Sequence, residues 1–416
     1  MPSALVVDTG HFLDVAVQLA RSGVRTYYYV DWVSGFPKVE DWAVGYGVPG
    51  VQKVDSIFAV ADEVDFILFA DVGFGETADY LRRKGYAVYG ASADGQRLEL
   101  DRAFMDAKLR EFGIPREKVF VVKGRSRLRD VIESFESEGR RAYVKISTFR
   151  GNVETFGVDT VRELDVWLDN ADFGPFAEEL TFVVEPEVEG VEIGADFIFD
   201  GRRIVRPYVW SPELKGQSVT CGRLVSGLDF LDDQFVSRFE RLLASLGYAG
   251  SVSMEAILKD DGTLHVTDIT ARFPFPMQGA VVRMYDFARL AQAVAERESV
   301  DGNEFALHEF GAEVGVYSSY GGWFMIGGLT DDGLSRYGLR YAVKAGSDYW
   351  HVPQSELVVS SIALSDVKAE HAMLDALDGT KELKFTGKTA ALNAIYDWFE
   401  MRDAVKAVIG YDPLGA

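Results

Sequence analysis

Two acidic residues of one predicted β-hairpin are placed where they could hold a metal ion together. Residues 253–270 read SMEAILKDDGTLHVTDIT, and the central Asp261-Gly262 pair favours a two-residue type I′ turn. With that turn, Glu255 pairs with Asp268 across the strands, as a non-hydrogen-bonded pair whose side chains approach closely. Two facing carboxylates repel each other, and Mg²⁺, which prefers hard oxygen ligands, would remove the repulsion.

Strand alternation extends this predicted site. Thr270 and Arg272 follow Asp268 on its own face, whereas His265 is expected on the opposite face. Two alternatives stay open for the hairpin itself: a register shifted by one residue, or a pair of acids on a solvated sheet edge.

A lysine in an apolar strand is the second candidate. Lys145 lies within the predicted strand 142–146, which runs into a polar loop containing Gly151. The ammonium group could meet nucleotide phosphates there, with Ser147 and the Gly151 backbone adding hydrogen bonds. The alternative is an edge-strand lysine that prevents aggregation. Taken alone, Arg102 indicates an ordinary helix-surface charge, and residues 185–192 a solvated acidic turn.

Composition excludes several classes of protein. The 416 residues carry 43 Lys and Arg against 65 Asp and Glu, a formal charge of −22, which disfavours non-specific nucleic-acid binding and anionic membrane surfaces. No apolar run is long enough to span a membrane, and the single cysteine, Cys221, is expected to be a small buried side chain. We therefore expect a cytoplasmic protein. The five histidines lack metal-ligand spacing, and no nucleophile elbow, P-loop or complete dinucleotide fingerprint is present.

The elements that must position these residues alternate between strands and helices. The first ~95 residues predict a parallel sheet covered on both faces, because short apolar strands such as 66–70 alternate with amphipathic helices. We therefore expect an α/β multidomain protein. Its further predicted elements are a helix at 97–113, a strand at 119–122, a helix at 128–138, a strand at 143–146, a helix at 161–168, a meander at 181–212, helices at 235–246 and 284–298, and a final aromatic-rich helix at 390–409.

The order of these pieces resembles the ATP-grasp ligases, and within them the phosphoribosylamine–glycine ligases. The motifs that carry the resemblance are VYGASADGQRLE at 88–99 with DRAFM at 101–105 and FGIP at 112–115, YVKI at 143–146, VVEPEVEGVE at 183–192, and VTDITARF at 266–273. They occur in the family's order from about residue 1 to 300. The resemblance implies an ATP-grasp fold with a Rossmann-like domain at 1–96, an ATP-grasp domain at 97–300 whose lid covers about 117–178, and a C-terminal α+β domain at 301–416.

The resemblance also implies roles for individual residues. Arg102 and Lys145 would contact the ATP phosphates, the segment Glu185, Pro186, Glu187 and Val188 would be the hinge against adenine, and Glu192 would lie near the ribose. Asp268 and Glu255 would bind Mg²⁺ or Mn²⁺, with Thr270 in place of the family's asparagine, and Arg272 would steady an acyl phosphate.

The implied activity is ATP- and Mg-dependent joining of a small carboxylic acid to an amine through an acyl phosphate. The sequence departs from the family at residues 8–14 and 274–277, where the substrates would bind, and at the phosphate loop 147–152, which has one glycine. Two alternatives therefore accompany a ligase with diverged substrates: a diverged true phosphoribosylamine–glycine ligase, and a non-catalytic nucleotide-binding or interaction protein.

Overall fold

A fully parallel sheet forms the N-terminal part of the chain. The computed structural model describes residues 1–31, 43–147, 155–170, 178–213, 218–353 and 357–415. Its first sheet has the order β3-β2-β1-β4-β5, every pair is parallel, and the apolar strand β1 is buried along its whole length, which confirms the predicted parallel sheet. Its members are β1 (Ser3–Asp8), α1 (Leu13–Arg21), β2 (Arg25–Val30), β3 (Val51–Lys53), β4 (Phe66–Phe69), α3 (Gly75–Arg83) and β5 (Val88–Tyr89).

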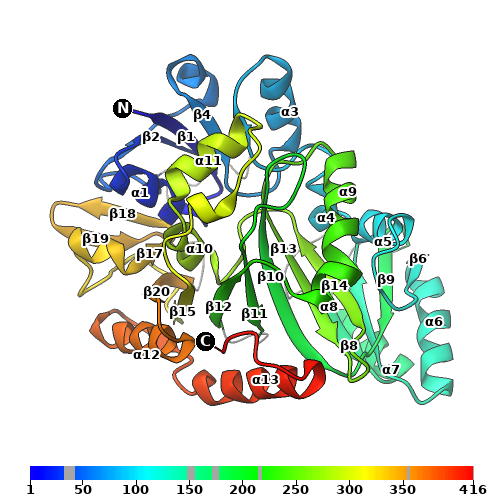
Figure 1. Cartoon of the computed structure of the whole chain (residues 1–416). Coiled ribbons are helices and arrows are strands. Elements are labelled where there is room, and N and C mark those ends of the chain that lie inside the picture. Colours follow the sequence, from blue (N-terminus) through cyan, green and yellow to red (C-terminus); the bar gives the residue numbers. More distant parts are fainter. Residues whose placement is uncertain (32–42, 148–154, 171–177, 214–217, 354–356, 416) are drawn as a thin grey trace.

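A small antiparallel sheet with the order β6-β9-β7-β8 follows, covered by two helices (Figure 1). The predicted helix 97–113 is two helices, because Asp101 caps the second one by accepting a hydrogen bond from the Phe104 amide at 3.1 Å. The elements are α4 (Arg97–Leu100), α5 (Arg102–Glu111), β6 (Phe120–Lys123), α6 (Arg125–Ser137), β7 (Ala142–Ile146), β8 (Thr155–Val158), α7 (Val161–Asn170) and β9 (Thr181–Pro186).

A nine-stranded antiparallel sheet forms the rest of the frame, and strands from both sides of residue 300 share it. Its order is β14-β13-β10-β11-β12-β15-β20-β17, with β21 paired to β15. The strands are β10 (Val191–Phe199), β11 (Tyr208–Pro212), β12 (Val219–Val225), β13 (Gly250–Leu258), β14 (Leu264–Thr270), β15 (Phe310–Ser318), β17 (Tyr337–Leu339), β20 (Leu357–Ser365) and β21 (Lys388–Ala390).

Helices and a further small sheet cover this frame. The predicted helix 284–298 corresponds to α11 (Phe287–Ala295), which begins only after Tyr285 because that residue forms a β-bridge with Ala306. The preceding helix α10 (Gln278–Met284) was not predicted. The helices are α8 (Asp229–Leu231) with a π-helical turn at Asp232–Val236, α9 (Ser237–Ser245), α10 (Gln278–Met284), α11 (Phe287–Ala295), α12 (Ala369–Gly379) and α13 (Ala394–Ile409), and the small sheet contains β16 (Phe324–Met325), β18 (Ala342–Ala345) and β19 (Asp348–His351). Short 3₁₀ turns lie at Ile57–Ala59, Ala61–Glu63, Gly302–Glu304, Asp332–Ser335 and Thr380–Glu382.

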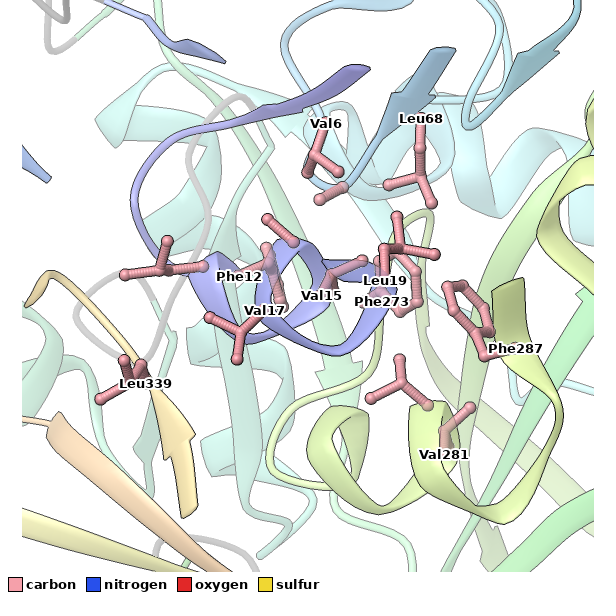
Figure 2. Close-up of a cluster of buried hydrophobic side chains, with 14 of the residues drawn as sticks. Val6, Phe12, Val15, Val17, Leu19, Leu68, Phe273, Val281, Phe287 and Leu339 are labelled. Atoms are coloured by element: carbon pink, nitrogen blue, oxygen red, sulfur yellow. The ribbon is translucent and has the colours of Figure 1, made fainter. Parts of the chain in front are cut away.

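One apolar core joins the N-terminal sheet to the rest of the molecule. Helix α1 lies between the strands that carry Val6 and Leu68 and the helices that carry Val281 and Phe287 (Figure 2). Phe273, which follows β14, packs into the same cluster. The end of the hairpin is therefore fixed against the N-terminal sheet. Among the described helices, none is both long and apolar enough to cross a membrane.

Candidate functional site at the meeting of two sheets

The hairpin pairs Glu255 with Asp268, as predicted, but its loop is one residue longer than expected and a β-bulge compensates. Next to the turn, Lys259 donates its amide hydrogen to the carbonyl of Thr263 at 2.9 Å, so three residues form the loop and the predicted two-residue turn is wrong. Gly262 occupies the left-handed position of this loop at φ +78°. The extra loop residue shifts the pairing by one.

A β-bulge then restores the predicted register. The pairing shifts between Glu255 and Ala256, which leaves Thr267 as the extra residue on β14. Beyond the bulge Glu255 pairs with Asp268, and Ser253 pairs with Thr270. Before the bulge His265 pairs with Ile257, which places it on the carboxylate face. The expectation that His265 lies on the opposite face is therefore wrong.

The bulge also provides an acceptor for Lys145. The ammonium group of this β7 lysine donates to the carbonyl oxygen of Thr267 at 3.0 Å and lies 3.1 Å from Oε1 of Glu185 on β9. Thr267 immediately precedes Asp268, so the small sheet brings its lysine beside the carboxylate pair of the large sheet. The side chains of Lys145 and Glu185 are only 9% and 5% exposed.

A second cation completes this buried charge network. Arg116 donates to Glu185 from a side chain that is 2% exposed. Burial would raise the pKa of the Glu185 carboxyl, but Lys145 and Arg116 act in the opposite direction and hold that pKa below its usual value. His265 lies close by, and its Nδ1 accepts a hydrogen bond from the amide of Glu117 at 2.8 Å. Burial lowers the pKa of His265 to about 4, so the ring is neutral at neutral pH.

Two further predicted phosphate contacts lie at the end of β7. The guanidinium of Arg102 donates to the carbonyl of Ile146 at 3.1 Å, and its backbone amide donates to the carbonyl of Ser147 at 3.0 Å. The Ser147 hydroxyl accepts from the amide of Ala103 at 3.0 Å and contacts Asp101 at 3.2 Å. Both side chains therefore lie at the start of segment 147–152, the predicted phosphate loop. Gly151, also predicted to bind phosphate, lies outside the described residues.

The predicted adenine hinge borders an open cleft. Pro186, Glu187 and Val188 line it together with Glu117, Arg140, Glu189 and the hairpin loop residues Lys259, Asp260 and Asp261. Glu192 lies farther along β10, paired with Ile257 of β13. The predicted hinge, the hairpin loop and the segment before β6 thus surround one space.

The carboxylate pair has the donor chemistry for a hard cation. Glu255 and Asp268 are paired and partly exposed, and one oxygen of Asp268 accepts from the amide of Ile269 at 2.9 Å. Within the described part of the chain, no group of three His, Cys, Asp or Glu side chains is arranged to hold a metal. Two carboxylates nevertheless fit Mg²⁺, which commonly takes one or two from the protein and its remaining ligands from phosphates and water. Thr270 is two pairs farther along, opposite Ser253.

A small polar pocket adjoins the carboxylate pair on its other side. Its lining is made of acids, hydroxyls and the residues of one loop, namely Asp196, Ser211, Glu213, Thr220, Ser253, Glu255, Thr270, Pro274, Phe275, Pro276 and Met277. Burial raises the pKa of Asp196 to about 7; a hydrogen bond with Ser253 acts in the opposite direction, and the charges of Glu255 and Glu313 add to the rise.

Arg272 is held by acids of the N-terminal part. Its Nε lies 2.9 Å from Oε1 of Glu99 and 3.4 Å from Oδ1 of Asp71, and its guanidinium stands over the ring of Phe12 at 5.5 Å. Asp71 in turn accepts from the hydroxyl of Thr9 at 2.6 Å. Because β1 and β4 are where the strand order reverses direction, these residues gather at the crevice where open α/β sheets bind ligands.

Not every residue of the N-terminal loop faces that crevice. Asp8 is fully buried, accepts from the Tyr28 hydroxyl at 2.6 Å, and has its pKa raised to about 6, mainly by burial. Asp14 is held by Arg283 in an interior ion pair at 2.7 Å. Residues 8–14, expected as a whole to line a substrate pocket, are thus partly structural. Cys221 is fully buried, as predicted.

Sequence reasoning missed Arg116, Glu99 and Asp196. Asp196 had a detectable signal, since it interrupts an apolar strand as Lys145 does. Glu99 ends the motif 88–99 that carries the family resemblance, but its contact with Arg272 has no signature in the sequence. Arg116 carried no signal, because its role depends on a long-range partner, Glu185.

Solved structures resemble this chain over nearly its whole length. Phosphoribosylamine–glycine ligase from Thermotoga maritima matches with a TM-score of 0.68 at 14% identity, over 93% of this chain and 98% of that one. N5-carboxyaminoimidazole ribonucleotide synthetase from Thermotoga maritima matches with a TM-score of 0.62 at 16% identity, over 93% and 100%. The biotin carboxylase domain of the Hydrogenobacter thermophilus 2-oxoglutarate carboxylase, solved with MgADP and bicarbonate, matches with a TM-score of 0.65 at 13% identity, over 98% and 97%.

No protein-family model matches the sequence, and no curated protein does. At 13% to 16% identity, the structural similarities define the fold rather than the substrates. All three structures belong to one superfamily, and their similarity covers the N-terminal sheet, the small sheet and the large sheet together. The chain has the ATP-grasp fold.

Proposed function

We propose that this protein is an ATP- and Mg²⁺-dependent ligase that joins a small carboxylic acid to an amine. In this reaction class the acid attacks the γ-phosphate of ATP to form an acyl phosphate, and the amine then displaces phosphate to form an amide. Positioning and charge neutralisation supply nearly all the catalysis, so no nucleophilic side chain is required.

One observation carries the proposal, namely the contact between Lys145 and the carbonyl of Thr267 at 3.0 Å. It joins a cation of the small sheet to the strand that bears Asp268, next to Glu255. Binding of a metal-bound triphosphate requires a cation for the phosphates and carboxylates for the metal, and both are provided by these neighbouring residues. The ATP-grasp fold and the MgADP found in the biotin carboxylase neighbour support the same reading.

Residues at different positions would have different roles in this reaction. Lys145 would hold a phosphate oxygen, and the backbone of residues 186–188 would hold the base in the open cleft. Mg²⁺ on Glu255 and Asp268 would neutralise phosphate charge. Arg272, oriented by Glu99 and Asp71, would face the acyl phosphate from the crevice of the N-terminal sheet.

The proposal can be tested before the amine is known. Hydroxylamine replaces the amine, because it converts acyl phosphates into hydroxamates that are read by their colour with ferric ion. A panel of carboxylic acids is incubated with ATP, Mg²⁺ and the wild-type protein. We expect at least one acid to give hydroxamate, with ADP and phosphate released in equal amounts.

The Lys145→Met variant should lose at least about tenfold in this rate, equivalent to about 1.4 kcal/mol of transition-state stabilisation. Lys123→Met, at an exposed lysine of strand β6 in the same sheet, is the matched control and should keep the wild-type rate. Tight binding of Mg·ATP with no ADP formed from any acid would contradict the ligase proposal and favour a non-catalytic nucleotide-binding protein.

A further inference from the structure

A buried arginine lies directly behind the candidate nucleotide cleft. Arg116 precedes Glu117, which lines the cleft together with Pro186. The Arg116 side chain is buried and donates to Oε1 of Glu185, the residue that precedes Pro186. One wall of the cleft is thus connected to a charged group in the interior.

Two cations share one oxygen atom of Glu185. The acid pairs with Tyr143 of β7, two residues before Lys145, so Glu185 and Lys145 lie on one face of the small sheet. The Lys145 ammonium lies 3.1 Å from Oε1 of Glu185, the same oxygen that accepts from Arg116. Because one carboxylate oxygen serves two cations, it holds each of them less tightly than it would hold one alone.

The shared oxygen matters because Lys145 must move in order to bind a phosphate. Its ammonium group is held by Glu185 and by the carbonyl of Thr267, to which it donates at 3.0 Å. A buried acid that loses its partner is strongly disfavoured, which opposes the departure of the lysine. The guanidinium of Arg116 does not lose its proton in proteins, so Glu185 keeps a cation when Lys145 turns away.

Stability alone does not account for an arginine at this position. Its Nε and Nη1 make no hydrogen bond within the described part of the chain, although Nε lies 3.5 Å from Oδ1 of Asp106. Burying unsatisfied donors is unfavourable, and an apolar side chain would fill the same space without that cost. The charge of Arg116 is better explained by its effect on Glu185 and Lys145.

We propose that Arg116 is a positioning residue for nucleotide binding: it keeps Glu185 neutralised, so that Lys145 is free to contact a phosphate oxygen of ATP. This inference rests on the proposed function and adds to it a residue that acts through Lys145 instead of touching the nucleotide. Without Arg116, Glu185 would bind Lys145 more tightly and keep it from the phosphates.

Calorimetric titration of Mg·ATP into single and double variants tests this proposal. Arg116→Met should bind Mg·ATP at least fivefold more weakly than the wild type, because Lys145 stays on Glu185. Adding Glu185→Gln to Arg116→Met should restore at least threefold of the lost affinity, since the neutral amide no longer retains the lysine. A role in stability alone predicts no recovery, because the second substitution removes a further buried contact. A double variant that binds no better than Arg116→Met would overturn the proposal.

A second neutral variant separates the charge of Arg116 from its hydrogen bond. Arg116→Gln retains a donor for Glu185 but not the positive charge, so it should show the same loss as Arg116→Met. It also supplies the result if the methionine variant does not fold. Wild-type affinity for Mg·ATP in Arg116→Gln would overturn the proposal.

Two controls exclude other causes of weaker binding. Arg110→Met removes an arginine that donates to Asp106 from a side chain that is 54% exposed, and it should retain the wild-type affinity. An equal loss in Arg110→Met and Arg116→Met would overturn the proposal, because a general loss of positive charge would explain both. Adenosine, which carries no phosphate, should bind Arg116→Met and the wild type equally in saturation-transfer NMR. Equal losses for adenosine and Mg·ATP would show a damaged cleft and would also overturn the proposal.

The two proposals can fail separately. A wild type that binds Mg·ATP, loses affinity with Lys145→Met and keeps it with Arg116→Met would overturn the role of Arg116 alone. A wild type that binds no Mg·ATP would contradict the proposed function itself, and this inference with it.

Discussion

A buried histidine next to the candidate nucleotide site connects the stability of this protein to pH. His265 is 2% exposed, and its Nδ1 accepts a hydrogen bond from the Glu117 amide at 2.8 Å, so that nitrogen must be unprotonated. Burial is the main cause that lowers the pKa of His265 to about 4, from 6.5. Between these two values the unfolded chain binds more protons than the folded one, so folding is disfavoured as pH falls.

The free energy of unfolding should therefore decrease by about 2 kcal/mol between pH 7 and pH 5 from this residue alone. The His265→Asn variant, whose side-chain carbonyl can accept the same hydrogen bond, should lack this part of the decrease. Urea unfolding of both proteins at the two pH values measures the difference. The His371→Asn variant, in which the changed histidine is exposed on α12, is the control and should follow the wild type. An equal decrease in the free energy of unfolding for wild type and His265→Asn would contradict the role of His265 in this pH dependence.

At the scale of elements, the hairpin depends on its glycine loop for the register of the carboxylate pair. Gly262 has φ +78° and open space around its α-carbon, so alanine there would suffer from its backbone conformation alone. We expect Gly262→Ala to lower the free energy of unfolding by about 1 kcal/mol. Gly321→Ala is the control, since Gly321 is equally unobstructed but has no left-handed φ. Equal effects in the two variants would show that the loop conformation is not the cause.

The same hairpin shows which of its features could be predicted from the sequence and which could not. The pairing of Glu255 with Asp268 was predicted from a two-residue turn, yet the loop has three residues and a bulge at Thr267 compensates. Two shifts of one residue cancelled each other. Turn residues such as Asp-Gly indicate a hairpin reliably, but the loop length depends on how the strands twist against their neighbours. The face of His265, which depends on the bulge, was therefore mispredicted.

Other elements were predictable where their pattern was local. The apolar runs of the N-terminal part indicated a parallel sheet, and β7 was found around Lys145 because the lysine interrupts an otherwise apolar strand. The exact start of α11 could not be predicted, because Tyr285 leaves the helical pattern to form a β-bridge with Ala306. Contacts of this kind between remote segments have no signature in sequence spacing.

At the scale of the whole molecule, the candidate site exists only where separate sheets meet. The small sheet contributes Lys145 and Glu185, the large sheet contributes Glu255 and Asp268, and the N-terminal part holds Arg272. Interior ion pairs keep these parts together: Arg283 binds Asp14 of α1 and also donates to the carbonyl of Leu334 at 3.0 Å. A net charge of −22 leaves local cations as the means of attracting a polyphosphate.

The central claim is that the paired carboxylates and Lys145 form one Mg·ATP site, and calorimetric titration of Mg·ATP tests it most directly. Wild type should bind, and Asp268→Asn should bind at least tenfold more weakly, a loss of about 1.4 kcal/mol or more. Asp130→Asn makes the same chemical change on an exposed helix face and should retain wild-type affinity. No binding to the wild type, or equal affinity for wild type and Asp268→Asn, would contradict the claim.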